Sequence, residues 1–268
     1  MAGPIAAAAL VNGPQGRGHN CPAELDSFER KRQDIVKNPV KITSVIVNCA
    51  LAAAIAIFPL QTAHATRHDR PKMITILALG DSLTAGFGLS PQQAYPALIA
   101  EKMRAAHYKF EMINAGWSGD TTAGGLERLP PLLQGKKIDI LILALGINDA
   151  FRGVPVEQMR SNLQAIIDQT RARHPDVSIV LAGIQLPLAA SDPYVRAFAE
   201  MFGPLAEKNH TALVPYLLQG VGGDPEFNQA DLVHPNAAGQ RVLAENVWRA
   251  LDPVLRKKFP APSGRGPG

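Results

Sequence analysis

Short apolar runs alternate with longer amphipathic stretches along residues 73–258. The apolar runs lie at residues 73–78, 110–114, 138–145, 177–182 and 212–214. Short runs that are apolar at nearly every position are typical of strands buried on both faces of a parallel sheet. Helical patterns occur at residues 95–106, 121–129, 155–173, 193–209 and 235–258. This alternation predicts an α/β domain with helices on both faces of a parallel sheet.

Prolines mark several of the expected helix boundaries. Pro130 follows the second helical pattern, and Pro155 suits the first turn of the third, where a missing N–H is tolerated. Pro204 and Pro253 fall inside the last two helical patterns. We therefore expect the last two helices to be kinked or split at these prolines.

An uncharged apolar run precedes this domain. Residues 42–60 carry no charge, and about 20 such residues are needed to cross the hydrocarbon core of a bilayer. Basic residues precede the run and Ala63-His64-Ala65 follows it, which is the layout of a secretory signal peptide. We expect a signal peptide over residues 36–65, cleaved after Ala65, and a periplasmic or secreted protein. A retained membrane anchor and a buried core helix are the alternatives.

The other segments outside the domain have compositions that predict no packed core. Residues 1–35 show no sustained apolar period, so we expect them to be disordered or to precede the true start of the protein. Residues 66–71 have the character of a linker, residues 72–259 form one compact domain, and the Pro- and Gly-rich residues 260–268 form a disordered tail. Both cysteines, Cys21 and Cys49, precede residue 66, and the sequence has no Cys/His cluster, so we expect no metal site.

The composition excludes several classes of function. The 268 residues are 46% hydrophobic and 19% charged, which is typical of a folded chain. The formal net charge is +4, and from Thr66 onward 21 Lys and Arg face 19 Asp and Glu, which argues against a nucleic-acid surface. Residues 80–86 lack the lysine of a P-loop, and residues 86–91 lack the third glycine of a dinucleotide fingerprint. We therefore expect no nucleotide or other cofactor.

Polar residues suited to catalysis lie at or near the ends of the predicted strands. They form four segments, Gly80-Asp81-Ser82-Leu83, Gly119-Asp120, Gly146-Ile147-Asn148-Asp149 and Asp231-Leu232-Val233-His234-Pro235. Because the carboxyl ends of parallel strands line one crevice, we expect the four segments to converge.

These segments contain all the groups needed for catalysis by a nucleophilic serine. A serine hydroxyl becomes nucleophilic when a base takes its proton and a third group orients that base. Asp231 and His234 are three residues apart on one turn, so the carboxylate reaches one imidazole nitrogen and leaves the other to face Ser82. The backbone N–H groups of Ser82 and Gly119 and the Asn148 amide are candidate oxyanion donors.

Each segment also has a structural interpretation when it is taken alone. Gly-Asp-Ser is common in turns, Gly119 suits a loop, and Asn148 suits an Asx turn. The segment around His234 suits a polar helix cap. Their joint occurrence, in this order and at strand ends, favours catalysis.

These segments, with Ser118 before Gly119, resemble the conserved blocks of the GDSL, or SGNH, hydrolases. Within that family the chain resembles bacterial esterases of the acyl-CoA thioesterase I, arylesterase and lysophospholipase type. The blocks that carry this closer resemblance are Ala78-Leu79-Gly80-Asp81-Ser82-Leu83, Tyr95-Pro96-Ala97-Leu98, Asn114-Ala115-Gly116, Leu126-Glu127-Arg128-Leu129-Pro130 and Gln185-Leu186-Pro187.

The resemblance, which covers residues 73–251, implies a flavodoxin-like three-layer αβα sandwich with strand order 2-1-3-4-5. It also implies a triad of Ser82, His234 and Asp231, and an oxyanion hole formed by Ser82, Gly119 and Asn148. Leu186 and Pro187 belong to the segment that lines the acyl pocket in relatives. Ile147 stands where the closest relatives have glycine, so we expect it to shape the substrate site.

We therefore expect a secreted serine esterase that hydrolyses carboxylic esters, or thioesters, of lipid-like or aryl acyl substrates through an acyl-enzyme. We expect a monomer that binds neither cofactor nor nucleic acid and is not stably inserted in a membrane after cleavage. One alternative is a deacetylase acting on O-acetyl groups of cell walls or polysaccharides. A non-catalytic ligand-binding module with the same fold is another.

Overall fold

A five-stranded parallel sheet forms the centre of the domain. The computed structural model describes residues 73–186 and 191–260. The strand order is β2-β1-β3-β4-β5, and every neighbouring pair is parallel. The strands are β1 (Ile74–Gly80), β2 (Phe110–Gly116), β3 (Ile140–Ala144), β4 (Ser178–Ala182) and β5 (Ala212–Val214). The predicted fold class and the strand order 2-1-3-4-5 are confirmed.

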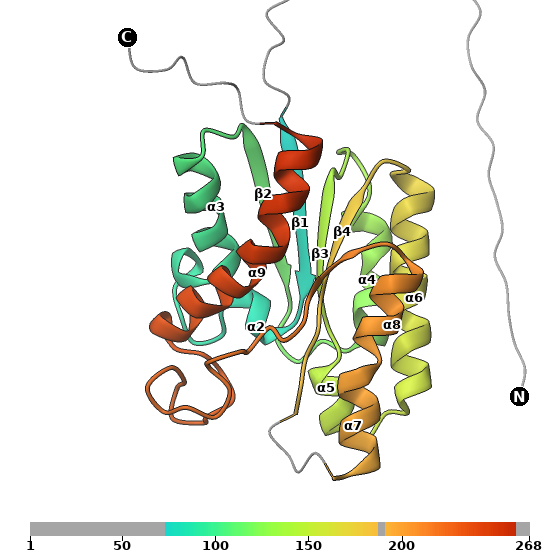
Figure 1. The fold of residues 1–268 in the computed structure, drawn as a ribbon, viewed down its shortest axis with the longest axis vertical. Helices are drawn as coiled ribbons and strands as arrows, with labels where there is room; N and C mark the ends of the chain where they lie inside the picture. Colours follow the sequence, from blue (N-terminus) through green and yellow to red (C-terminus); the bar gives the residue numbers. More distant parts are fainter. Residues whose placement is uncertain (1–72, 187–190, 261–268) are drawn as a thin grey trace, which may run out of the picture. The chain divides into compact units, whose positions relative to one another are not determined.

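Helices cover both faces of the sheet (Figure 1). On one face, α3 (Tyr95–Ala105) packs against α9 (Ala237–Lys258), and on the other α4 (Thr122–Leu132) packs against α6 (Val156–Arg173). The helices α7 (Pro193–Glu200) and α8 (Phe202–Lys208) contact α6. A 3₁₀ turn, η1 (Pro91–Gln93), precedes α3. The layers therefore follow the predicted αβα sandwich.

The core explains why the central strands are apolar throughout. Every residue of β1 and β3 is buried, because both strands lie inside the sheet and helices cover both of their faces. The edge strand β2 is only partly buried. On α9 the buried residues Leu243, Val247, Leu251 and Leu255 recur every four positions and form the apolar stripe that faces the sheet.

The expectation about Pro130 was wrong, whereas the expected split of the helix over residues 193–209 is confirmed. Pro130 does not end its helix, because Pro130 and Pro131 lie in the last turn of α4, which continues to Leu132. As expected, the predicted helix over residues 193–209 is split, and the break lies at Met201. Pro204 therefore falls in the first turn of α8, where its missing N–H costs no hydrogen bond. Helix α9 is not split at Pro253 and continues to Lys258, with buried leucines at Leu251 and Leu255 on either side of the proline.

Two short helices begin close behind the central strands. Helix α2 (Ser82–Ala85) follows β1 after one residue, and α5 (Ile147–Phe151) follows β3 after two. Both lie at the edge where β1 and β3 end (Figure 1). Neither was predicted, because four or five residues are too few to show a helical period. These two helices carry Ser82 and Asn148.

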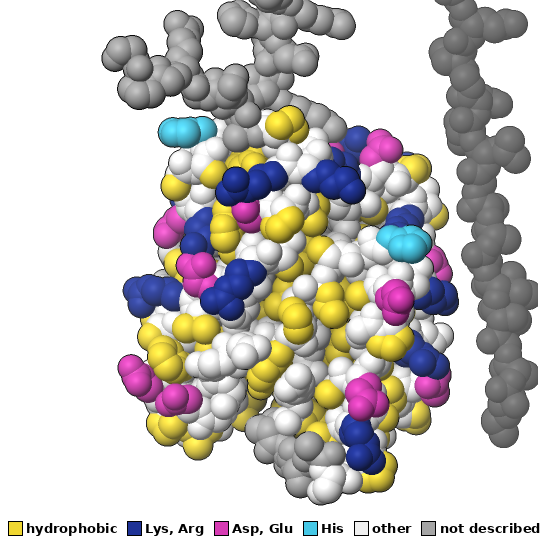
Figure 2. Space-filling view, viewed as in Figure 1, with side chains coloured by type: hydrophobic (Ala, Val, Ile, Leu, Met, Phe, Trp, Pro, Cys, Tyr) yellow, Lys and Arg dark blue, Asp and Glu magenta, His cyan; other side chains and the backbone are white. Residues whose placement is uncertain are grey.

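Several predicted segments lie outside the described residues. They are residues 1–35, the signal peptide at residues 36–65, the linker at residues 66–71, most of the tail at residues 260–268, and Pro187. Within residues 73–186 and 191–260, no helix is long and apolar enough to cross a membrane. On the face shown in Figure 2, charged side chains of both signs surround a central strip of hydrophobic and uncharged side chains. That face therefore carries no patch of a single charge.

Candidate active site

Ser82 lies at the end of β1, where the chain turns sharply into α2. The Asp81 carboxylate accepts a hydrogen bond from the N–H of Leu83 at 2.9 Å and caps this helix. Gly80 is required before it, because a Cβ there would lie 1.9 Å from the Thr84 hydroxyl and 2.9 Å from the Ala144 carbonyl oxygen. The turn holds the Ser82 hydroxyl at the carboxyl edge of the sheet.

His234 and Asp231 reach Ser82 from the other end of the chain. The distance from His234 Nε2 to Ser82 Oγ is 3.0 Å, and that from His234 Nδ1 to Asp231 Oδ2 is 2.7 Å. Asp231 Oδ1 also accepts the backbone N–H groups of Val233 and His234, at 3.0 and 2.9 Å. The structure therefore brings the three predicted triad residues into one hydrogen-bonded chain.

The environment of Asp231 determines the state of the imidazole. The backbone N–H of His234, its side chain and the N–H of Val233 lower the pKa of Asp231 to about 2. Because an ionised carboxylate only accepts hydrogen bonds, the shared proton belongs on Nδ1 of His234. The Nε2 lone pair then faces the Ser82 hydroxyl, which is the arrangement a general base needs.

The turn that carries this pair is strained and is tied to its surroundings. Leu232 has a φ of 57°, which is unfavourable for a residue with a bulky side chain. The N–H of Gln229 donates to the His234 carbonyl at 2.8 Å, and the Gln229 amide donates to the Phe87 carbonyl at 2.7 Å. Gln229 therefore connects the His234 turn to the loop that follows α2.

Gly119 and Asn148 lie on neighbouring loops at the same edge. Gly119 has a φ of 81°, and a Cβ built on it would have open space around it. The Asn148 amide donates to the Asp120 carbonyl at 2.9 Å, and Arg152 donates to the Gly119 carbonyl at 3.0 Å. The loop after β2 and helix α5 therefore hold the two predicted oxyanion donors close together.

Charged residues to which the sequence analysis assigned no role support these loops. Arg128 donates to Asp120 at 2.6 Å and to the Gly80 carbonyl at 2.9 Å, which joins the loop after β2 to the end of β1. Asp149 accepts the N–H and the hydroxyl of Thr122, at 2.8 and 2.6 Å. Arg128 and Asp149 belong to segments quoted for the resemblance, which was the only sequence signal for them.

The predicted substrate-contacting residues have different surroundings. Ile147 and Leu186 are buried in the hydrophobic core, and Pro187 lies outside the described residues. Their contact with a substrate stays a prediction. In the described part of the chain, no three His, Cys, Asp and Glu side chains are grouped as metal ligands would be.

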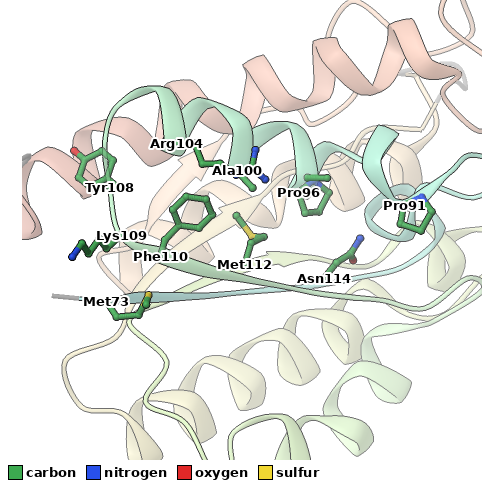
Figure 3. A pocket seen from close by; sticks show the side chains of 11 residues that line it. Met73, Pro91, Pro96, Ala100, Arg104, Tyr108, Lys109, Phe110, Met112 and Asn114 are labelled. Carbon is green, nitrogen blue, oxygen red and sulfur yellow. The ribbon is translucent and has the colours of Figure 1, made fainter. Parts of the chain in front are cut away.

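A groove of about 650 Å³ lies away from these residues, between α3 and the edge strand β2 (Figure 3). Phe110 and Met112 of β2 line it opposite Ala100 and Arg104 of α3. Its lining includes neither Ser82 nor His234. The groove is therefore separate from the candidate active site.

Comparison with known proteins agrees with this geometry. Residues 78–242 match the model of the GDSL-like lipase/acylhydrolase family. The chain belongs to this family. It is therefore a GDSL hydrolase of the esterase and thioesterase type.

Three relatives show how far the likeness extends. The chain is 41% identical to esterase TesA of Pseudomonas aeruginosa over 68% of its own length and 89% of that protein. It is 34% identical to thioesterase 1/protease 1/lysophospholipase L1 of Escherichia coli K12, over 68% and 85% of the two chains. A crystal structure of TesA superposes with a TM-score of 0.64 and covers 68% of this chain and 99% of its own. Esterase EstA from Pseudoalteromonas, inhibited by monoethylphosphonate, is 30% identical, with a TM-score of 0.63 and coverage of 68% and 98%.

Next to Ser82 this GDSL hydrolase buries the carboxyl group of Asp81, and only one of its two oxygens accepts a hydrogen bond from another residue among those described. Asp81 is fully buried, and its Oδ2 has no hydrogen-bond partner among the described residues. Burial, with a smaller contribution from the nearby carboxylates of Asp120 and Asp149, raises the pKa of Asp81 to about 7 against the opposing Leu83 N–H. The folded enzyme therefore favours the neutral form of Asp81.

This raised pKa makes the stability of the fold depend on pH. The contribution of Asp81 is fully present below its usual pKa of 3.8 and is lost as the pH rises through about 7. Between pH 5 and pH 8 the wild type should lose more free energy of unfolding than Asp81→Asn, which has no such proton to release. Urea unfolding of both proteins at several pH values tests this, and parallel pH profiles would contradict it.

Proposed function

We propose that this GDSL hydrolase is an exported serine esterase that cleaves acyl esters of lipid-like or aryl alcohols through an acyl-enzyme. The hydrogen-bonded chain from Asp231 through His234 to Ser82 is the observation that carries the proposal. A base within 3.0 Å of a serine hydroxyl, itself oriented by an ionised carboxylate, has the arrangement required of an activated nucleophile.

The first half of the reaction forms the acyl-enzyme. His234 Nε2 takes the Ser82 proton as Oγ attacks the acyl carbonyl, and Asp231 stabilises the imidazolium that results. The proton then passes from His234 to the leaving alcohol or thiol as the bond from the acyl carbon to that group breaks. In the second half, His234 takes a proton from water, which attacks the acyl carbon and releases the acid and free Ser82.

The negative charge that develops on the carbonyl oxygen needs donors on the same side of the site. We assign this role to the backbone N–H groups of Ser82 and Gly119 and to the Asn148 amide. An amide nitrogen carries two hydrogens, so the bond from Asn148 to the Asp120 carbonyl leaves one for the substrate. The bond to Asp120 also fixes the amide in place before the substrate arrives, which is how such donors are most effective.

Export is the second component of the proposal. The uncharged residues 42–60 and the Ala63-His64-Ala65 site support it. Outside the cytoplasm, lysophospholipids and short or aryl acyl esters are more suitable substrates than acyl-CoA. The mass of the exported protein tests this, since cleavage leaves Thr66 as the first residue, whereas an uncleaved species that pellets with membranes would contradict it.

A series of p-nitrophenyl esters with acyl chains from acetyl to long-chain tests the esterase proposal. The wild type should hydrolyse chains longer than acetyl, and Ser82→Ala should lose turnover by several orders of magnitude while it stays folded. Activity should fall at acidic pH, because only the neutral imidazole of His234 accepts the Ser82 proton. Activity confined to acetyl esters would favour the deacetylase, and no activity would favour the binding module.

The oxyanion assignment has its own test in Asn148→Ala. Loss of one such donor should lower kcat by roughly 10² to 10³ with little change in KM, because the bond strengthens mainly in the transition state. Asn162→Ala is a matched control, since it removes the same amide group from α6, where the amide donates at 3.0 Å to the Thr122 hydroxyl and has no proposed role in the reaction. If Asn148→Ala kept kcat within a few-fold of the wild type, as the control should, the assignment would be wrong.

A further inference from the structure

Large exposed hydrophobic side chains are concentrated around the candidate active site. Among the described residues six are exposed, and five of them lie beside Ser82, His234, Gly119 or Asn148. We call these five the apolar rim: Phe87, Trp117, Phe151, Leu232 and Val233. The sixth, Met73, lies at the opposite edge of the sheet, before the start of β1.

The rim comes from four separate segments that meet at one edge of the sheet. Phe87 follows α2, and its ring centroid lies 4.5 Å from that of His234. Trp117 follows β2, and its backbone N–H donates to the Gly80 carbonyl at 3.0 Å. Phe151 ends the short helix that begins beside Asn148, and the other two rim residues separate Asp231 from His234.

Such exposure is costly unless something covers it. Trp117, in the loop after β2, is 69% exposed, and Phe151, at the end of α5, is 53% exposed. Single exposed apolar residues are common on protein surfaces, but a group of large ones around one site indicates a docking surface. Leu232 also keeps its side chain exposed at a strained φ of 57°.

We propose that the apolar rim docks the enzyme onto the surface of aggregated acyl lipids, so that substrate enters the active site directly from the aggregate. This inference rests on the proposed function and adds the physical form of the substrate. A protein seated on the rim would close off Ser82, whereas a lipid surface would cover the rim with substrate.

The chemistry of the rim suits a lipid surface. The indole of Trp combines a large apolar ring with one N–H donor, and this favours the boundary between lipid and water. Arg152 is exposed next to Phe151 and is held by its bond to the Gly119 carbonyl, so a cation lies beside the apolar side chains. Phospholipid and lysophospholipid headgroups carry a phosphate that this cation complements.

Trp117 allows a direct test, because the chain has only two tryptophans and the other, Trp248, lies on α9. The Ser82→Ala background removes hydrolysis. In Ser82→Ala/Trp248→Phe, vesicles of brominated phosphatidylcholine with lysophosphatidylcholine should quench the fluorescence of Trp117. In the matched protein Ser82→Ala/Trp117→Phe, the same vesicles should leave Trp248 largely unquenched. Because each protein reports one tryptophan, membrane attachment through another part of the chain would not imitate the result.

A pair of further substitutions tests whether the rim itself supplies the affinity. On the Trp117-only background, Phe151→Ser should weaken the apparent lipid affinity about ten-fold, because the variant loses a large apolar side chain that would be buried in the lipid. Met73→Ser removes a side chain of comparable exposure from the opposite edge and should leave the affinity unchanged.

Three results would overturn the docking proposal. They are an unquenched Trp117, equal quenching of Trp117 and Trp248, and equal effects of Phe151→Ser and Met73→Ser. Self-association that protects Trp117 from lipid, detected by sedimentation, would assign the rim to a second copy of the chain instead. The readouts do not depend on turnover, so failure of the esterase proposal would appear separately in the ester series.

Discussion

The hydrogen bond between Ser82 and His234 joins residues 152 positions apart, and the proposed function depends on keeping the two ends of the domain together. Gln240 on α9 is one residue that does so. It is buried, accepts the Tyr95 N–H at 2.8 Å and donates to the Leu83 carbonyl at 3.2 Å. The start of α9 is thereby fixed to α2 and α3. Gln229 makes a second link, through the Phe87 carbonyl. The triad geometry is therefore a consequence of how α9 packs on the sheet.

A second constraint is electrostatic and concerns the carboxylates at the carboxyl edge of the sheet, next to Ser82. Asp81, Asp120 and Asp149 lie close to Ser82, and buried carboxylates repel one another unless each is compensated. Arg128 compensates Asp120, and Thr122 donates two hydrogen bonds to Asp149. For Asp81 the cost of burial outweighs the hydrogen bond from the Leu83 N–H, and the pKa of its carboxyl group is raised as a result. The edge that holds the reactive groups is thus also a place where the fold gives up some stability.

Most of the fold could be predicted from the sequence, because strands buried on both faces leave a continuous apolar run and three of the four polar segments follow strand ends. The helix boundaries were less predictable. Pro130 and Pro253 are tolerated inside helices because tertiary packing outweighs the local preference. The meeting of Ser82, His234 and Asp231 could be predicted, because a serine, a histidine and a carboxylate in these segments suit one catalytic site. The supporting contacts of Arg128, Gln229 and Gln240 and the exposure of Trp117 were not, because they depend on side-chain contacts between distant segments.

The central claim is that His234 and Asp231 make Ser82 a nucleophile. Reaction with an alkyl fluorophosphonate, followed by peptide mass spectrometry, tests it most directly because it needs no assumption about the substrate. The wild type should carry the adduct on Ser82. The rate of labelling should fall by roughly 10³ or more in His234→Ala, since the hydroxyl then has no base. Labelling at another residue, or labelling of Ser82 at an unchanged rate in His234→Ala, would contradict the claim.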